Sequence, residues 1–165
     1  QLVRANLAQE LGYLNTQILG EGQTLCILDT GIDSNHSSFT GRIIAGKNFI
    51  DEIQPAIDDN GHGTHVAGIA AANGTFIGVA PRAGIIAVKV CDATGNCPGS
   101  AILAGIDYCI NNSAQYNIST ISGSFADRGE YNSSNCPTYF EPALAAVNER
   151  NISTVFAAGN KIFFL

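Results

Sequence analysis

The sequence predicts an α/β fold, in which an open, mostly parallel and twisted sheet forms the middle of three layers, with helices on both faces. Two observations predict this fold. Short apolar runs of strand length alternate with segments in which small and apolar residues recur at helical spacing. The apolar runs contain few polar residues, which is typical of parallel strands that are buried on both faces. The ligand site of such a sheet lies beyond the carboxyl ends of its strands.

Five apolar runs predict the strands, and three segments between them predict helices. The first run, TLCILD, carries Asp29 at its carboxyl end. In the second helical segment, apolar side chains at Ile102, Ile106 and Ile110 share one face, and Pro137 and Thr138 predict the start of the third helix. The predicted strands are 24–29, 41–50, 84–90, 117–123 and 152–159, and the predicted helices are 63–73, 99–112 and 138–151.

Composition places the chain among folded proteins and limits its partners. With 165 residues, 45% hydrophobic and 13% charged, the chain fits one domain with a sizeable core. A net charge of −6 argues against a nucleic-acid partner, and no apolar run of about 18 residues predicts a membrane span. The start has neither Met nor an apolar leader, so we expect a piece of a longer precursor. We assign 1–165 to one partial domain, with KIFFL (161–165) as an atypical tail.

Five cysteines and six N-x-S/T sequons favour a secreted, extracellular protein. Cys91 and Cys97 bracket a Gly-Asn turn and could close that loop with a disulfide. The odd number of cysteines leaves at least one unpaired, and Cys26, inside an apolar run, is the expected buried thiol. No C-x-x-C pair occurs, which argues against a zinc ribbon or a thioredoxin-type redox site.

The segment CILDTGID (26–33) allows two interpretations, because a D-T-G after an apolar strand occurs in two classes of protease. In aspartic proteases it presents one of two carboxylates that share a proton. In one class of serine proteases it presents the Asp of a catalytic triad. This chain has a single D-T-G, and a homodimer of short all-β chains, which could supply the second carboxylate, is contradicted by the predicted helices.

The segment DDNGHGTHVAGIAA (58–71) decides between the two interpretations. With it, the chain resembles the subtilisin-like serine proteases, or subtilases. Asp29 matches the triad Asp of that family, and His62, 33 residues later, matches the triad His in the family's order. Further matches follow in order through about residue 160: GVAPRAGIIAVKV (78–90), STISGS (119–124) and FAAGN (156–160).

The resemblance implies a serine-type endopeptidase that hydrolyses peptide bonds through an acyl-enzyme. Asp29 would orient the imidazole, His62 would act as general base, and the side-chain amide of Asn160 would donate to the oxyanion. The substrate partner would be a polypeptide in extended conformation, and the full precursor would carry a pro-segment. No cofactor is expected for the chemistry, and structural calcium is possible in the family but has no assignable ligands here.

The resemblance also implies two walls of a substrate cleft. A peptide would pair with one strand and face a loop on the opposite side. Asp58 is a further candidate at the edge of the cleft. The expected substrate-binding residues are Gly95, Asn96, Ser122, Gly123, Ser124 and Asp58.

Other polar residues near these motifs have simpler interpretations. His62 and His65 form an H-x-x-H pair that could bind a metal, but no Glu follows His62 and no third ligand is evident. We therefore predict no metal site and interpret His65 as structural. Asp33, His36 and Asp59 are expected as solvated or helix-end polar residues.

The nucleophile of the triad is absent from these residues. The family places its Ser in G-T-S-M-A after the oxyanion Asn, and no G-T-S-x-A occurs here. Ser124, in GSFA (123–126), precedes FAAGN and is followed by a polar loop, so we do not expect it to be the nucleophile. The sequence thus predicts the C-terminally truncated, N-terminal part of a peptidase domain, inactive alone. The alternatives are a non-catalytic, peptide-binding pseudoprotease and a defunct gene fragment.

Overall fold

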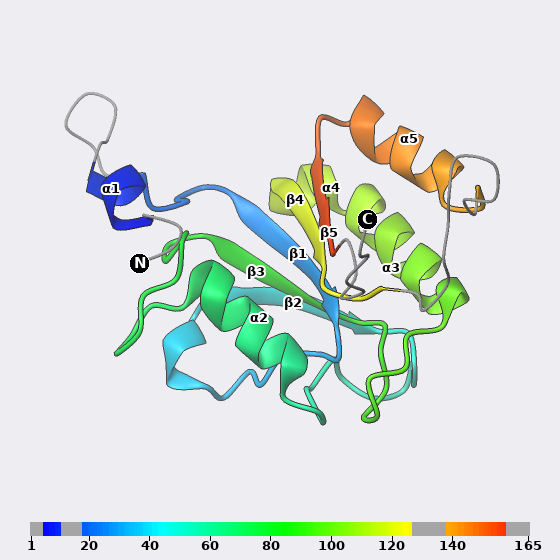
Figure 1. The fold of residues 1–165 in the computed structure, drawn as a ribbon, viewed down its shortest axis with the longest axis horizontal. Helices are drawn as coiled ribbons and strands as arrows, with labels where there is room; N and C mark the ends of the chain where they lie inside the picture. Colours follow the sequence, from blue (N-terminus) through cyan, green and yellow to red (C-terminus); the bar gives the residue numbers. More distant parts are fainter. Residues whose placement is uncertain (1–4, 11–17, 127–137, 158–165) are drawn as a thin grey trace, which may run out of the picture.

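A computed structural model of the chain describes residues 5–10, 18–126 and 138–157. Within these ranges a five-stranded sheet, in which every strand pair is parallel, has the order β2-β3-β1-β4-β5 (Figure 1). The predicted open parallel α/β fold is confirmed. The strands are β1 (Thr24–Asp29), β2 (Ile43–Asn48), β3 (Gly84–Lys89), β4 (Ile118–Gly123) and β5 (Ser153–Phe156).

Helices cover both faces of the sheet. Alternate side chains of the central strand β1 point to opposite faces, and each set packs against a helix. Ile27 packs in one cluster with Ala67 of α2, whereas Leu28 packs in another with Ile106 of α3. Figure 1 shows α2 on one side of the sheet and α3 and α5 on the other. The helices are α1 (Ala5–Glu10), α2 (His62–Ala71), α3 (Gly99–Asn111), α4 (Ser113–Tyr116) and α5 (Glu141–Glu149), with a 3-10 turn, η2 (Ser37–Phe39).

The predicted start of the last helix is wrong by three residues. Thr138 to Phe140 form a turn, and α5 begins at Glu141 with Pro142 in its first turn. A proline fits the first helical turn, where its missing N–H has no helical partner, but it would interrupt the interior of a helix that began at Thr138. The other predicted strands and helices agree with the structure to within about two residues at each end, except that β5 ends at Phe156, whereas the predicted strand runs to residue 159, beyond the described residues.

Two disulfides join cysteines of the described residues. Cys91 bonds to Cys97, which confirms the predicted loop closure. Cys26, however, bonds to Cys109, so its prediction as an unpaired thiol is wrong. Cys26 on β1 and Cys109 on α3 face the same side of the sheet and are both completely buried. The sequence does not reveal this pairing, because it depends on α3 crossing over β1.

Several predicted features lie outside the described residues. These are the oxyanion candidate Asn160, the polar loop segment 127–137 with Pro137, and the tail 161–165. No helix in the described part of the chain is long and apolar enough to cross a bilayer.

Candidate active site

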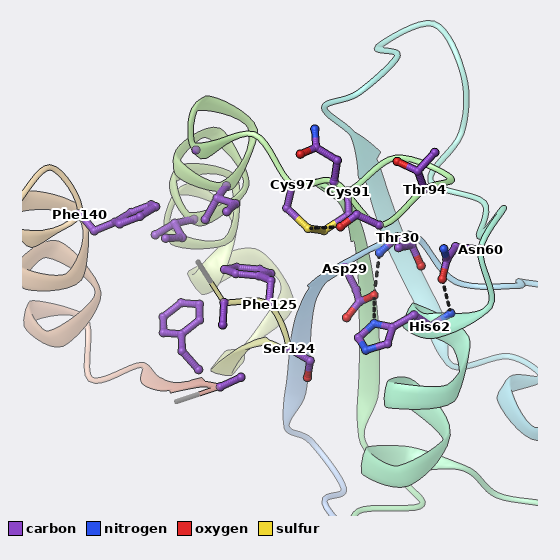
Figure 2. A pocket seen from close by; sticks show the side chains of 18 of the residues that line it. Asp29, Thr30, Asn60, His62, Cys91, Thr94, Cys97, Ser124, Phe125 and Phe140 are labelled. Atoms are coloured by element: carbon purple, nitrogen blue, oxygen red, sulfur yellow. Dashed lines mark hydrogen bonds and ion pairs between the residues drawn. A yellow bond between two sulfur atoms is a disulfide. The ribbon is translucent and has the colours of Figure 1, made fainter. Parts of the chain in front are cut away.

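The carboxyl ends of the central strands meet at one edge of the sheet, where an open cleft of about 1080 Å³ lies. The chain crosses from β1 to β2 and β3 on one side and then returns to β4 on the other, so this edge is the switch point where parallel sheets place their sites. Asp29, at the end of β1, and His62, the first residue of α2, line the cleft together (Figure 2).

Asp29 and His62 form a direct hydrogen bond, with 2.7 Å between the carboxylate Oδ1 and the imidazole Nδ1. Only 3% of the Asp29 side chain is exposed, whereas 46% of the His62 side chain is. An ionised carboxylate can only accept, so Nδ1 carries the proton in this bond and Nε2 of the neutral ring is left as a base. The same Oδ1 accepts a hydrogen bond from the Thr30 backbone N–H at 2.8 Å.

Glycine at position 63 allows α2 to begin this close to the end of β1. A Cβ atom on Gly63 would lie 2.1 Å from the carbonyl oxygen of Gly31 and 3.1 Å from Oδ1 of Asp29. No side chain fits at that distance, so the second Gly of GHG is a steric requirement of the Asp–His contact.

Asp58 fixes the turn that precedes α2. Its Oδ1 accepts from the Thr30 hydroxyl at 2.7 Å and from the Gly61 N–H at 2.9 Å, and its Oδ2 accepts from the Thr64 N–H at 2.9 Å. Partial burial acts to raise the pKa of Asp58, but hydrogen bonds from Thr64, Gly61 and Thr30 outweigh it and hold that pKa well below its usual range. The carboxylate is therefore engaged by the turn itself, and it does not line the cleft.

A buried cation, which the sequence interpretation missed, lies behind this turn. The Nζ of Lys89, whose side chain is 4% exposed, donates to the Thr30 carbonyl at 2.6 Å and to Asp59 Oδ1 at 2.5 Å. Asp59 is therefore an ion-pair partner rather than only a solvated residue. A lysine at the end of an otherwise apolar strand, in AVKV, was the available signal, because a buried lysine needs an anionic or carbonyl partner.

The expected substrate-binding residues of the two walls lie at different places relative to the cleft. Gly95 and Asn96 line it from the loop after β3, and Ser124 lines it from the end of β4. Ser122 and Gly123 lie inside β4, where they pair with β1 on one side and β5 on the other. The backbone of these two residues is therefore already paired within the sheet on both sides.

Aromatic side chains also line the cleft, and Figure 2 shows Phe140 and Phe125 on the side away from His62. Phe125 and Phe156 have ring centroids 5.8 Å apart, and those of Tyr139 and Phe140 are 4.4 Å apart. They belong to the same cleft as Asp29 and His62. The site thus combines a polar end with an acid–base pair and an apolar, aromatic end.

The described residues contain no group of three or more His, Cys, Asp or Glu side chains close enough to hold a metal ion. His65 is exposed on α2, and the Nδ1 of His62 is bonded to Asp29. His36 lies at the start of η2, where its Nδ1 accepts from the Ser38 N–H at 3.3 Å, and Asp33 accepts from the Asn35 N–H at 2.9 Å.

Comparison with known proteins identifies the family. The model of the subtilase family matches residues 20–163. A subtilisin-like protease 3 of Pseudogymnoascus destructans is 41% identical over 150 residues, which cover 90% of this chain and 35% of that protein. Thermitase of Thermoactinomyces vulgaris is 40% identical over 114 residues, which cover 67% of this chain and 41% of that protein.

A solved structure agrees with these matches. The crystal structure of a cold adapted subtilisin-like serine proteinase superposes with a TM-score of 0.70 at 29% identity and covers 90% of this chain and 50% of that chain. The chain therefore belongs to the subtilase family of peptidases. It spans about a third of the length of the first curated relatives that it matches.

Proposed function

We propose that this chain supplies the Asp and His of the triad of a subtilisin-type serine endopeptidase. The observation that carries the proposal is the 2.7 Å bond between buried Asp29 and half-exposed His62 at the carboxyl ends of the strands. Asp29 fixes the tautomer in which Nε2 of His62 takes the proton of a serine hydroxyl as that hydroxyl attacks a peptide carbonyl. The protonated imidazole then gives the proton to the leaving amine, and an acyl-enzyme remains for hydrolysis.

Asn160 is the proposed oxyanion donor, on the basis of its place in FAAGN. One such donor lowers the barrier by about 3–4 kcal/mol in enzymes of this type. The nucleophilic Ser is proposed to lie on a part of the protein outside residues 1–165, because no G-T-S-x-A occurs in them. Residues 1–165 alone are therefore expected to bind peptide without hydrolysing it.

The proposed substrate is a polypeptide in extended conformation. It would lie between the loop that contains Gly95 and Asn96 and the segment from Ser124 onward, with apolar side chains toward the aromatic end of the cleft. Secretion is proposed on the support of the two disulfides, which persist in oxidising compartments. A pro-segment in the full precursor is a further proposal that rests on the family.

A fluorophosphonate probe, which labels activated serines, tests the assignment of the nucleophile. Purified 1–165 should remain unlabelled and should turn over a peptide p-nitroanilide no faster than its His62→Ala variant. Labelling of Ser124 that disappears in His62→Ala would refute the proposal that the nucleophile lies elsewhere. In a longer chain that includes a G-T-S-x-A segment, Asp29→Ala and His62→Ala should each lower kcat by at least about 10⁴-fold.

Peptide binding is tested separately by NMR. An unlabelled extended peptide titrated into ¹⁵N-labelled 1–165 should shift the amide signals of residues 94–97 and 124–126. Shifts confined to the opposite end of the sheet would contradict the proposed cleft. The same titration with and without His62→Ala tests the pseudoprotease alternative, a non-catalytic module that holds extended peptides in this cleft.

A further inference from the structure

The wall of the cleft after β3 is a small, disulfide-closed loop, Cys91–Cys97. Inside it, Oδ1 of Asp92 accepts from the N–H of Thr94 at 2.9 Å, from its hydroxyl at 2.7 Å and from the N–H of Asn96 at 3.0 Å. The Asp92 N–H in turn donates to the Asn96 carbonyl at 2.9 Å. The covalent closure and these bonds hold the loop in one shape.

This loop is attached to the strand end that carries Asp29. The backbone carbonyl of Asp29 accepts from the N–H of Val90 at 2.9 Å and from the N–H of Cys91 at 3.1 Å. Cys91, one of the two cysteines of the disulfide, is therefore hydrogen-bonded directly to the backbone of Asp29, the residue that orients the imidazole.

A second attachment joins the loop to the start of α2 through Asn60. The Asn60 side chain donates from Nδ2 to the Ala93 carbonyl at 2.9 Å, and its Oδ1 accepts from the backbone N–H of His62 at 3.2 Å. An amide side chain offers the donor and the acceptor on two separate atoms, so it can make both bonds at once. In Figure 2, Asn60 lies beside the backbone of His62, and the disulfide lies on the same rim of the cleft.

We propose that Asn60 is a positioning residue for His62, which couples the Cys91–Cys97 loop to the start of α2. The loop thus braces both members of the Asp29–His62 pair while it forms a cleft wall. Its catalytic meaning rests on the proposed function, but the coupling itself is a property of the folded chain. The prediction is that opening the disulfide, or removing the Asn60 amide, loosens the imidazole from Asp29.

Reduction by a dithiol offers a selective perturbation. Cys97 is partly exposed, whereas Cys91 is 3% exposed and Cys26 and Cys109 are fully buried. A reagent thiolate attacks Sγ of Cys97, the S–S bond breaks, and Cys91 leaves as a thiolate that takes up a proton. The second reagent thiol then releases Cys97 as a thiol, and the reagent is oxidised to its own disulfide.

The test follows the imidazole Nδ1–H signal of His62 by ¹H–¹⁵N NMR on purified 1–165, with Asp29→Asn used to assign it. We expect a protected, downfield signal in the oxidised protein, and its loss in Asn60→Ala and after mild reduction that mass spectrometry shows to be limited to Cys91–Cys97. Asn35→Ala, an exposed loop asparagine outside the cleft lining, should keep the signal. The β1 amide signals report whether each variant is folded.

Retention of the downfield signal in folded Asn60→Ala, or after selective reduction, would overturn the proposal. If Asn60→Ala does not fold, Asn60→Asp keeps the acceptor for the His62 N–H and loses the donor to Ala93, so it tests the link to the loop alone: we expect the signal to be lost, and its retention would overturn the coupling. The readout needs no turnover. A failure of the proposed function, seen as labelled Ser124 or as absent activity in the longer chain, is therefore distinguishable from a failure of this coupling.

Discussion

The two disulfides should contribute very differently to stability, because they close chain segments of very different length. Cys26 and Cys109 are 83 residues apart, and Cys91 and Cys97 are six apart. In the chain-entropy account, closure of the long segment lowers the entropy of the unfolded chain by an amount worth about 4.5 kcal/mol at 25 °C. The same relation gives about 2 kcal/mol for the short loop. Truncation of the buried Cys26 and Cys109 side chains adds a packing loss to the first value.

The comparison uses two double variants, Cys26→Ala/Cys109→Ala and Cys91→Ala/Cys97→Ala. Urea unfolding followed by far-ultraviolet circular dichroism gives the free energy of unfolding of each against the parent chain. We expect the first variant to lose at least about 2 kcal/mol more than the second. Equal losses, or a loss below about 2 kcal/mol for the buried pair, would refute the reasoning that segment length and burial decide the contribution.

Three further predictions concern the start of α2. Gly63→Ala should destabilise the chain by more than about 2 kcal/mol, because its Cβ would lie 2.1 Å from the carbonyl oxygen of Gly31. Gly68→Ala, in the same helix but with nothing within 4 Å of its Cβ, should stabilise the chain by up to about 1 kcal/mol. The midpoints of urea unfolding of the two variants measure the difference. The pKa of Asp58 is lower in the folded than in the unfolded state. Its contribution to the free energy of unfolding is therefore complete above the unfolded pKa of about 4 and is lost as the pH falls through the folded pKa. In unfolding curves measured over a pH series, the difference in stability between the parent chain and Asp58→Asn should shrink below about pH 4. Asp59→Asn should lower the free energy of unfolding by about 3 kcal/mol, because it leaves buried Lys89 without its anion. Lys89→Met should lower it by no more than about 1 kcal/mol, because the Asp59 that loses its partner is half exposed. Similar losses for the two variants in thermal unfolding would contradict this asymmetry.

Local sequence was sufficient to predict the parallel sheet, whereas the pairing of Asp29 with His62 was predicted from the resemblance to the subtilases. An apolar run without alternation, such as TLCILD, is distinctive of a central parallel strand, and the carboxyl end of that strand is where the fold places a site. The structure adds the contact itself: Asp29 and His62 are 33 residues apart in sequence and 2.7 Å apart in space.

The features that sequence reasoning missed all depend on which segments meet in three dimensions. The partner of Cys26 lies on a helix that packs over β1, and the burial of Lys89 depends on a turn that contributes Asp59. The paired positions of Ser122 and Gly123 follow from β5 lying beside β4. Neither hydrophobic periodicity nor motif spacing contains this information.

The contacts around Asp29 and His62 come from the ends of β1 and β3, the turn before α2 and the loop after β3. The bonds made by Asp58 and Lys89 join the ends of β1 and β3 to the turn before α2, and the loop after β3 adds the bond from Asn60. All of these residues precede Asn96. Because each of these contacts lies among the described residues, the Asp29–His62 hydrogen bond forms within residues 1–165 themselves. Under the proposed mechanism, a pair already held in this geometry needs little reorganisation when a serine hydroxyl approaches Nε2, and this is where an orienting carboxylate is most effective.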